Sequence, residues 1–582
     1  MKAFAITLSL ALLWTTNAAG QGIFRTAQLL ANRSATQNCL TVEDADGNQY
    51  LAITFYDTLK LKHPDQTLSV RNFSGRAQGR AGVALLKLDR NGRRLGSLVL
   101  TDSTQALQAQ QFNLLPSGDL ELSFFAAGAL LANGIRLQQN PTPAGQQEGP
   151  GYALLDTSLR IRQQYQCRYP KVGAYISTVA ATGPSHVFIS SFANTDTVQL
   201  NGQRFVAPAY LQGQYNQYAY VAQMPKAAGP TQLIYFWTRR GSQGAPSISR
   251  IDHDADGNCY ITLSAYQTGD IYMNDSVIAS CRDAGAVVIK LGPGGRKQWA
   301  SLIAAKYGMQ VTAMAASPLQ DKIYLAFSVL GRSVLAGQQF DTDTVISPSC
   351  PQTYLGAMGA LVLDAETGAQ LHASVFRHRH AHYTFKGQMD RIVVNPYGEV
   401  YWGGSIQGNP TLFGGPPVQG WQTLFVAATG PNLELRWISR IGGPVDGTER
   451  QLVSMRYSPY WQELQLVGGL TSWPQATAVG VGNTIVSATR PALFTAALQG
   501  LRLTGMEGQK QTLAPYPNPA TTGSLISAGI GGTGRFALAD ATGRRFACTS
   551  LPDGRLRLPQ VVAGVYTLLG PQGQKARLVI QP

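Results

Sequence analysis

The stretch DHDADGNCYITLSAYQTGDIYMNDSVIASCRDAGAVVIKLGPGGRKQW, residues 252–299, decides the fold of this chain. It opens with an Asp- and Gly-rich turn, which leads into a short apolar run from Cys259 to Leu263. After a polar loop, a second apolar run covers Ala286 to Leu291, and a Gly-rich turn precedes Trp299. Short apolar runs bounded by Gly, Asn and Asp are typical of β-strands joined by tight turns. The stretch therefore predicts a small multi-stranded sheet.

Divergent copies of this turn and its first strand recur along the chain. The seven copies are GNQYLAI from Gly47, GDLELSF from Gly118, SHVFISS from Ser185, GNCYITL from Gly257, DKIYLAF from Asp321, GEVYWGG from Gly398 and QELQLVG from Gln462. A second apolar run follows each copy: VALLKLD from Val83, YALLDTS from Tyr152, YAYVAQM from Tyr218, AVVIKLG from Ala286, ALVLDAE from Ala360, TLFVAAT from Thr423 and ALFTAAL from Ala492. The fourth position of a copy is aromatic except at Glu121 and Gln465. The runs have strand length and strand composition, so they predict an all-β chain.

Seven copies of such a unit predict a seven-bladed β-propeller over residues 21–505. A small twisted sheet can bury its faces only against neighbours, and a closed ring leaves no terminal unit uncovered. Three tryptophans stand at similar sequence distances before the fourth position of the next copy: Trp237, Trp299 and Trp437. Phe24 stands at a similar sequence distance before the fourth position of the first copy. We therefore expect the N-terminal segment to supply the final strand of the last blade. Two tandem β-sandwiches remain the alternative, since regularly spaced short strands also describe them.

The repeat also has a recognisable pattern of turns. A Gly-Asn-x-Tyr turn, an apolar run and a Gly turn followed by Trp resemble the repeats of seven-bladed bacterial extracellular propellers of the SBBP-like type. The resemblance covers about residues 21–505.

The first twenty residues have the pattern of a secretory signal peptide. Lys2 is followed by an apolar run from Ala3 to Trp14 and by small and polar residues up to Gly20. This order is typical of a cleaved export signal, which predicts residues 1–20 as a signal peptide. No later run approaches the roughly 18 apolar residues that span a bilayer, so we expect a mature chain without a transmembrane segment.

The repeat stops near residue 505, and a polar linker at 506–514 leads to a different C-terminal region. Pro515 opens this region and is followed by Tyr516, Pro517, Asn518 and Pro519. Proline blocks a helix and fixes an extended entry. Short apolar stretches follow, such as FALAD from Phe536 and GVYTLL from Gly564. Residues 515–582 therefore predict a small Ig-like β-sandwich.

This C-terminal region resembles the type A sorting domain of the type IX secretion system of Bacteroidota, also called the Por secretion system. The matching positions are Tyr516, Pro517, Asn518, Pro519, Gly564 and Tyr566. The resemblance implies that the type IX machinery is a partner and carries the chain across the outer membrane. The protein would then be secreted or displayed on the cell surface. A structural β-sandwich stalk is the alternative for this region.

Composition limits the classes of partner. The formal net charge is +15, but residues 510–582 hold eight Lys and Arg against two Asp and Glu, so the tail alone supplies +6. No dense basic run marks a nucleic-acid surface, and we expect no nucleic-acid partner. A diffuse positive field is compatible with anionic polysaccharide or lipid headgroups.

The six cysteines lack the CxxC spacing of zinc sites and redox motifs. Export permits disulfides, and Cys259 with Cys281 is a plausible local pair because both lie in one repeat. Six cysteines allow 15 pairings, so the sequence leaves the connectivity open.

Two patterns suggest metal ions. Asp252, Asp254 and Asp256 alternate before Gly257, as in the first half of a calcium loop, although Leu263 stands where an EF-hand has Glu. The alternative is an Asp/Gly turn that enters a strand. Three alternating histidines would share one face of a strand, but flanking arginines equally suggest an exposed polar strand; they are His378, His380 and His382. Calcium is the one cofactor that the sequence suggests.

No catalytic motif is present, and no residue is predicted to be catalytic. The segment around Tyr210, Tyr215, Tyr218 and Tyr220 is rich in aromatic and amide side chains, which stack on sugars and bond their hydroxyls. The leading hypothesis is a secreted or surface-displayed, non-enzymatic binding or adhesion protein for an extracellular partner such as a polysaccharide. Alternatives are an extracellular polysaccharide-active hydrolase or lyase and a structural envelope component.

Overall fold

The computed structural model describes residues 23–32, 38–56, 58–62, 65–69, 81–102, 107–115, 117–126, 128–137, 146–170, 180–183, 185–193, 197–200, 203–209, 218–226, 229–238, 246–265, 269–281, 284–306, 308–340, 344–347, 350–354, 356–376, 388–408, 410–418, 420–441, 449–458, 462–471, 477–481, 484–488, 492–499, 520–521, 523–527, 536–540, 545–550, 555–569 and 575–581. The regular elements in these ranges are β-strands, which confirms the all-β prediction. In the same ranges, no helix is long and apolar enough to cross a lipid bilayer.

Within the described ranges up to residue 499, seven antiparallel sheets share a core of four strands, and we name each sheet after its first strand. The cores are β2 (Asn38–Glu43), β3 (Gln49–Tyr56), β6 (Ala81–Leu88) and β7 (Arg94–Asp102); β8 (Gln108–Leu114), β9 (Leu120–Phe125), β12 (Gln146–Leu155) and β13 (Ile161–Pro170); β14 (Ala180–Thr182), β15 (His186–Ala193), β18 (Tyr218–Pro225) and β19 (Gln232–Thr238); β20 (Ser247–His253), β21 (Cys259–Ala265), β24 (Gly285–Leu291) and β25 (Lys297–Ala305); β26 (Gly308–Ala316), β27 (Lys322–Leu330), β32 (Gly356–Asp364) and β33 (Gln370–Phe376); β34 (Gln388–Val394), β35 (Val400–Gly408), β36 (Gly420–Thr429) and β37 (Leu435–Ile441); and β38 (Glu449–Ser458), β39 (Glu463–Thr471), β42 (Ala492–Gln499) and β1 (Ile23–Asn32). The predicted strands after each turn are the second strands, and the second apolar runs are the third strands.

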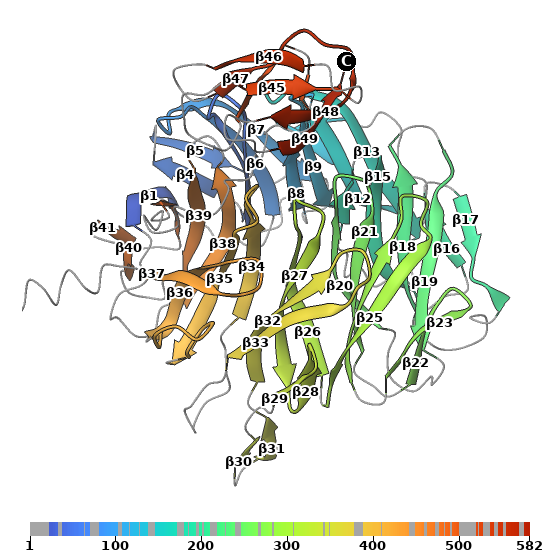
Figure 1. The fold of residues 1–582 in the computed structure, drawn as a ribbon. Helices are drawn as coiled ribbons and strands as arrows, with labels where there is room; N and C mark the ends of the chain where they lie inside the picture. The colour runs from blue at the N-terminus through green and yellow to red at the C-terminus, as the bar shows by residue number, and fades with distance from the viewer. Residues whose placement is uncertain are drawn as a thin grey trace, which may run out of the picture.

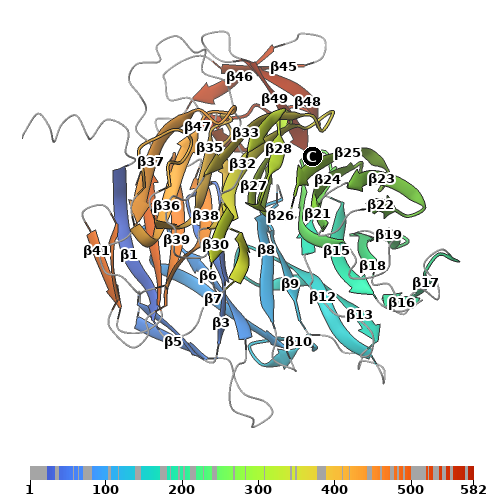
Figure 2. The ribbon, with the colours of Figure 1, turned by 90° about the horizontal axis from the view of Figure 1, so that it is seen from below.

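The first strands of these sheets contact one another around an axis. The contacting pairs are β2 with β8, β8 with β14, β14 with β20, β20 with β26, β26 with β34, β34 with β38, and β38 with β2. The series returns to its starting strand, so the sheets form a propeller-like ring (Figures 1 and 2). Hydrophobic clusters fill the space between neighbouring sheets; one joins Tyr260 and Trp299 of the β20 sheet to Leu325 and Leu361 of the β26 sheet.

The N-terminal strand closes this ring. Strand β1 pairs antiparallel with β42, from Ile23 opposite Gln499 to Asn32 opposite Ala492. It therefore supplies the outer strand of a sheet whose other core strands come from the last repeat. This confirms the prediction made from Phe24.

Hairpins inserted between the second and third strands extend the preceding sheet. They are β4 (Thr58–Lys62) with β5 (Asp65–Ser69) on β1, β10 (Leu130–Ala132) with β11 (Ile135–Arg136) on β7, β22 (Gly269–Met273) with β23 (Ser276–Cys281) on β19, β28 (Ser333–Leu335) with β29 (Gln338–Phe340) on β25, and β40 (Thr477–Val481) with β41 (Thr484–Ala488) on β37. Two further hairpins form separate two-stranded sheets, β16 (Thr197–Leu200) with β17 (Gln203–Val206) and β30 (Thr344–Ser347) with β31 (Cys350–Tyr354). The hairpins account for repeats that are longer than the ~40 to 45 residues of a WD-type blade.

In two of these hairpins, an asparagine at the tip bonds the hairpin to the preceding sheet. Asn133 adopts a φ of 48°, and its backbone N donates to the carbonyl of Val99 on β7 at 2.8 Å. Its side-chain oxygen accepts from the backbone N of Val99 at 3.1 Å. Asn274, at a φ of 54°, makes the equivalent pair of bonds with Tyr235 on β19. Asn tolerates this left-handed conformation better than most residues, so these tips favour tight hairpins.

The C-terminal region forms a sheet of its own. Its order is β43 (Ala520–Thr521), β49 (Lys575–Gln581), β48 (Gly564–Leu569), β45 (Phe536–Ala539), β46 (Arg545–Ser550), β47 (Arg555–Arg557) and β44 (Leu525–Ser527). A separate hydrophobic core includes Phe536, Leu568 and Leu578. The sheet lies at one end of the ring, opposite to the β30–β31 hairpin (Figure 1). Arg555 reaches the ring there, donating to the carbonyl of Ala45 at 3.3 Å.

The disulfide predicted between Cys259 and Cys281 is wrong, because both residues are free thiols in the structure. Cys259 lies on β21, whereas Cys281 lies on β23, which extends the preceding sheet. Membership of one repeat thus does not place two residues in one sheet. Both side chains are buried in the same hydrophobic cluster, and burial raises the pKa of Cys281 to about 11.

Candidate functional site

The Asp/Gly turn between β20 and β21 is organised around the buried side chain of Asp254. Its Oδ1 accepts from the backbone N of Asp256 at 3.0 Å and of Asn258 at 2.9 Å. Its Oδ2 accepts from Asn258 Nδ2 at 2.7 Å and from the Tyr260 hydroxyl at 2.9 Å. Gly257 completes the turn at a φ of 80°, which glycine adopts without strain. The carboxylate of Asp254 therefore stabilises the turn and the buried tyrosine after it.

The other two predicted calcium ligands point to different surroundings. Asp252 accepts from the backbone N of His253 at 2.9 Å and from that of Ala316, in the neighbouring sheet, at 3.3 Å. Asp256 is exposed. Among the described residues, no group of three or more His, Cys, Asp and Glu is arranged to hold a metal ion. The contacts are those of the alternative, an Asp/Gly turn entering a strand, and calcium binding stays a prediction.

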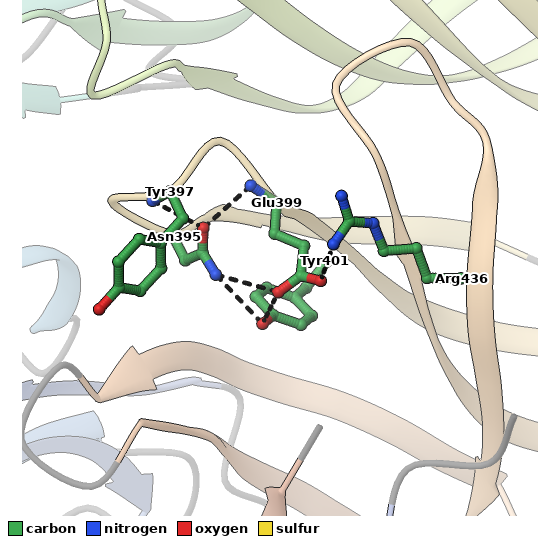
Figure 3. Close-up of polar contacts among 5 residues, drawn as sticks. All are labelled: Asn395, Tyr397, Glu399, Tyr401 and Arg436. Carbon is green, nitrogen blue, oxygen red and sulfur yellow. Dashed lines mark hydrogen bonds and ion pairs between the residues drawn. The ribbon is translucent and has the colours of Figure 1, made fainter. Parts of the chain in front are cut away.

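The same network recurs in two other repeats. In the first repeat Asp44 accepts from two backbone N–H groups, from the Asn48 side chain and from the Tyr50 hydroxyl. In the sixth, an asparagine replaces the aspartate and a glutamate supplies the carboxylate (Figure 3). Asn395 Oδ1 accepts from two backbone N–H groups, and Glu399 accepts from the Tyr401 hydroxyl at 2.7 Å and from Arg436 at 2.9 Å. These turns are scaffold, because their polar atoms are bonded within the chain.

The two repeats without an aromatic fourth residue place that residue against a basic side chain instead. Glu121 lies 2.7 Å from Lys226 of the β14 sheet, and the glutamate side chain is only 2% exposed. Gln465 accepts at 2.7 Å from Arg456, which also pairs with Glu43 of the β2 sheet. Glu121 thus belongs to an ion pair that joins two sheets. Gln465 bonds an arginine whose ion pair with Glu43 joins two sheets.

A second group of polar residues lies around the axis, where the first strands carry β-bulges. Five first strands shift register by one residue, next to Ala109, Ile248, Val311, Met389 and Leu452. A bulge leaves one residue unpaired and redirects the side chains beside it. The bulges of β20 and β34 are each followed by an arginine, Arg250 and Arg391.

Both arginines bond the bulge of the next sheet. Arg250 donates through Nε to the carbonyl of Thr312 at 2.8 Å, and through Nη1 to that of Ser249 at 2.9 Å. Arg391 donates through Nε to the carbonyl of Val453 at 2.9 Å. The two arginines thus make equivalent contacts, because each guanidinium bonds a backbone carbonyl that a bulge leaves unpaired. We call Arg250, Asp390 and Arg391 the axial cluster.

Asp390 is the acidic member of the axial cluster. Its Oδ1 is buried and has no hydrogen-bond partner among the described residues. Burial raises the pKa of this carboxyl, while the positive charges of Arg391 and Arg250 act in the opposite direction. Burial lowers the pKa of Arg250, and repulsion from Arg391 adds to this shift. The three side chains therefore act on one another electrostatically.

The sequence interpretation missed this cluster, although a signal existed. Arg250 and Arg391 each stand ten residues before the tyrosine of their repeat, Tyr260 and Tyr401. Aligning the repeats with one another therefore places the two arginines at equivalent positions of their first strands. The repeat alignment could not show that a bulge brings this position to the axis.

Several other predicted positions lie outside the described residues. They are His378, His380, His382, Tyr210, Tyr215 and the sorting-motif residues Tyr516 to Pro519. Tyr218 and Tyr220 are buried core residues of β18, so they are not exposed for stacking on a ligand. Gly564 begins β48, and Tyr566 is buried with its hydroxyl donating to the carbonyl of Val562 at 2.9 Å.

No family model matches this chain, and no curated protein matches it. Among solved structures, it is similar to a member of the DUF4221 family from Bacteroides vulgatus, with 9% identity, 53% of this chain and 92% of the other covered, and a TM-score of 0.22. It is also similar to a mutant of the Synechocystis apocarotenoid oxygenase, with 11% identity, 82% and 95% covered, and a TM-score of 0.29. Both TM-scores are too low to support an inference about the site.

Proposed function

We propose that this chain is an exported seven-bladed β-propeller that binds an extracellular glycan, followed by an Ig-like sorting domain. The blade count is supported by the seven four-stranded cores of the described ranges and by the cycle of contacts among their first strands. Pairing of β1 with β42 supports a closed ring. A closed ring is a rigid scaffold, on which binding groups keep their geometry.

The observation that carries the binding proposal is the difference in hydrogen bonding between the turns and the axial cluster. The turn carboxylates are satisfied by their own repeats, as at Asp254. Asp390, in contrast, keeps a buried oxygen without a partner in the described part of the chain. Ten buried side-chain polar atoms lack a partner in the described ranges, and Asp390 Oδ1 is the one carboxylate oxygen among them. A charged group is the costliest to leave unbonded, so this atom points most strongly to a missing partner. Arg250, Asp390 and Arg391 are partly exposed as whole residues, so a ligand that reaches the axis would meet them, although Oδ1 of Asp390 is itself covered by the chain.

Binding is tested with the full exported chain on an array of extracellular polysaccharides and their oligosaccharides. We expect retention of one or more glycans without any release of shortened products. Absence of binding to every glycan on the array would contradict the proposed function.

A second candidate is a polysaccharide hydrolase or lyase that works at the axis, and Asp390 is the observation that favours it. A buried carboxyl with a raised pKa is suited to act as a general acid. The same polysaccharides, incubated with the chain and analysed for new reducing ends or unsaturated products, distinguish the two. Product formation that disappears in Asp390→Asn would favour the enzyme.

Export by the type IX machinery is proposed from the C-terminal motif. The separate sheet and core of this region support a domain that folds apart from the ring. Deletion of residues 515–582 in a host with this machinery should leave the chain in the periplasm, whereas the full chain reaches the medium or cell surface. Equal export of both forms would contradict a sorting role. Deletion of residues 1–20 should keep the chain in the cytoplasm.

A further inference from the structure

The axial cluster has hydrogen-bonding capacity that the described chain does not use. A guanidinium carries five N–H donors. Arg250 uses donors on Nε, Nη1 and Nη2 for the carbonyls of Ser249 and Thr312, and Arg391 uses donors on Nε and Nη1 for those of Val453 and Asp390. At least two donors therefore remain on each arginine for an acceptor outside the described contacts. Asp390 Oδ1 remains as an acceptor.

The cluster is built as one unit across three sheets. Arg250, on β20, bonds the Thr312 carbonyl on β26, and the Thr312 hydroxyl bonds the Met389 carbonyl on β34. Met389 directly precedes Asp390 in the β34 bulge. The positions of the two arginines relative to Asp390 are thus fixed by bonds to backbone, which do not depend on a ligand.

The charges of the cluster select the chemistry of a ligand. Two guanidiniums and one carboxylate leave an excess of one positive charge when all three are ionised, so an anion is favoured over a cation. Guanidinium donors match the geometry of a carboxylate. The free oxygen of Asp390 requires a donor, and a neutral hydroxyl meets it without repulsion from the arginines. The complementary ligand therefore combines a carboxylate with a nearby hydroxyl group.

We propose that the axial cluster binds a uronic acid unit of an acidic polysaccharide, with the sugar carboxylate on Arg250 and Arg391 and a sugar hydroxyl donating to Asp390. This inference rests on the proposed function, since it names the ligand class of the same binding protein. It also gives the net positive chain a specific anionic partner.

The test is isothermal titration calorimetry of the full chain with trigalacturonate, trimannuronate and hyaluronan tetrasaccharide. We expect binding of at least one of the three. Its methyl ester, which keeps the shape and removes the charge, should bind at least tenfold more weakly. Arg391→Gln and Arg250→Gln should each weaken the acidic sugar at least tenfold. Asp390→Asn, which alters the acceptor, should weaken both the acid and the ester.

Arg296→Gln is the matched control, because Arg296 is exposed in the turn between the third and fourth strands of its sheet, whereas the axial cluster lies on first strands. It should bind as the wild type does. Thermal unfolding of each variant shows whether the ring remains folded, and Arg391→Lys keeps the charge as a second variant if Arg391→Gln does not fold. Equal affinity for acid and ester, unchanged affinity in the arginine variants, or no binding of any of the three sugars would overturn the axial assignment. A neutral glycan retained on the array in the same experiments would leave the proposed function standing.

Discussion

The turn around Asp254 and the axial cluster around Asp390 use the same chemical group in opposite ways. The carboxylate of Asp254 accepts four hydrogen bonds from its own turn and strand. The carboxylate of Asp390 is also buried, yet its Oδ1 has no partner in the described chain. Saturated carboxylates stabilise a fold, whereas an under-used one beside two arginines is available to a ligand. The difference separates scaffold from candidate site.

The largest effect is expected at Lys226, where an ion pair replaces the usual tyrosine contact. Lys226→Met leaves the 2% exposed side chain of Glu121 without its counter-charge. Breaking a buried ion pair on one side should lower the free energy of unfolding by about 3 kcal/mol, measured by urea denaturation. The control is the double variant Glu121→Leu with Lys226→Met, which should recover most of the loss. A single variant as stable as the wild type would mean that this pair is not part of the scaffold.

Asp254→Ala should have the next largest effect. It removes the acceptor of two backbone N–H groups, one amide and the buried Tyr260 hydroxyl, which should cost about 2 kcal/mol in thermal or urea unfolding. Asp256→Ala is the control, since Asp256 is exposed and should change stability by less than about 0.5 kcal/mol.

The same pair of variants tests the calcium hypothesis. If the turn is scaffold only, added calcium leaves the Tm of the wild type unchanged. A calcium-dependent rise in Tm that is lost in Asp256→Ala would instead support a metal site.

Asp390→Asn should raise the free energy of unfolding, whereas the first two variants lower it. The pKa of Asp390 is raised by burial, so the folded protein holds this proton more tightly than the unfolded chain does. The stability that the protonated form contributes is complete below the unfolded pKa and is lost as the pH rises through the folded pKa. The variant should therefore be more stable than the wild type at neutral pH, by about 1.4 kcal/mol for each unit by which folding raises this pKa. The gain should shrink as the pH falls toward the unfolded pKa of about 4 and vanish below it. Unfolding curves from pH 4 to pH 8 measure this, and a variant that is less stable at all pH values would contradict it.

The smallest effect is expected at the contact between the C-terminal sheet and the ring. Arg555 lies 3.8 Å from Asp46, whose side chain is 79% exposed. Exposed ion pairs contribute at most about 1 kcal/mol and weaken with salt. Arg555→Gln should change the unfolding of the ring by less than about 0.5 kcal/mol. A large loss of ring stability would mean that the C-terminal sheet is part of the scaffold.

The repeat pattern identified most of the ring. Turn signals and apolar runs are local properties of the sequence, so they located the second and third strands of each core. Phe24 gave the closing strand because it matches the spacing of the tryptophans. The segment that carries Cys281 was predicted as a polar loop within its own repeat. It forms the β22–β23 hairpin on the preceding sheet instead, and this pairing depends on tertiary packing and not on local pattern.

The site was harder to predict than the fold. The partner of Glu121 is 105 residues away, at Lys226, and a single sequence does not indicate such pairs. The axial cluster depends on bulges in β20 and β34. The β34 bulge lies opposite Gly403 and Gly404, where a Cβ on Gly404 would collide with the backbone of Gln388 and Met389, so this Gly-Gly pair is a local signal of the bulge. The β20 bulge faces Leu263 and Thr262 and has no such signal. Arg250 and Arg391 could be aligned, but their place at the axis required the three-dimensional arrangement.

The hairpins that five repeats add to the preceding sheet, in the described part of the chain, have a consequence for assembly. Because the chain is synthesised from its N-terminus, the outer edge of such a sheet is completed only after the next repeat has been made. Strand β1 waits longest, because its partner β42 lies at the far end of the ring sequence. Contacts of such long sequence separation slow folding, since the intervening chain must be ordered first. Until the last repeat arrives, β1 presents an unpaired strand edge, and premature pairing with another chain becomes the main hazard.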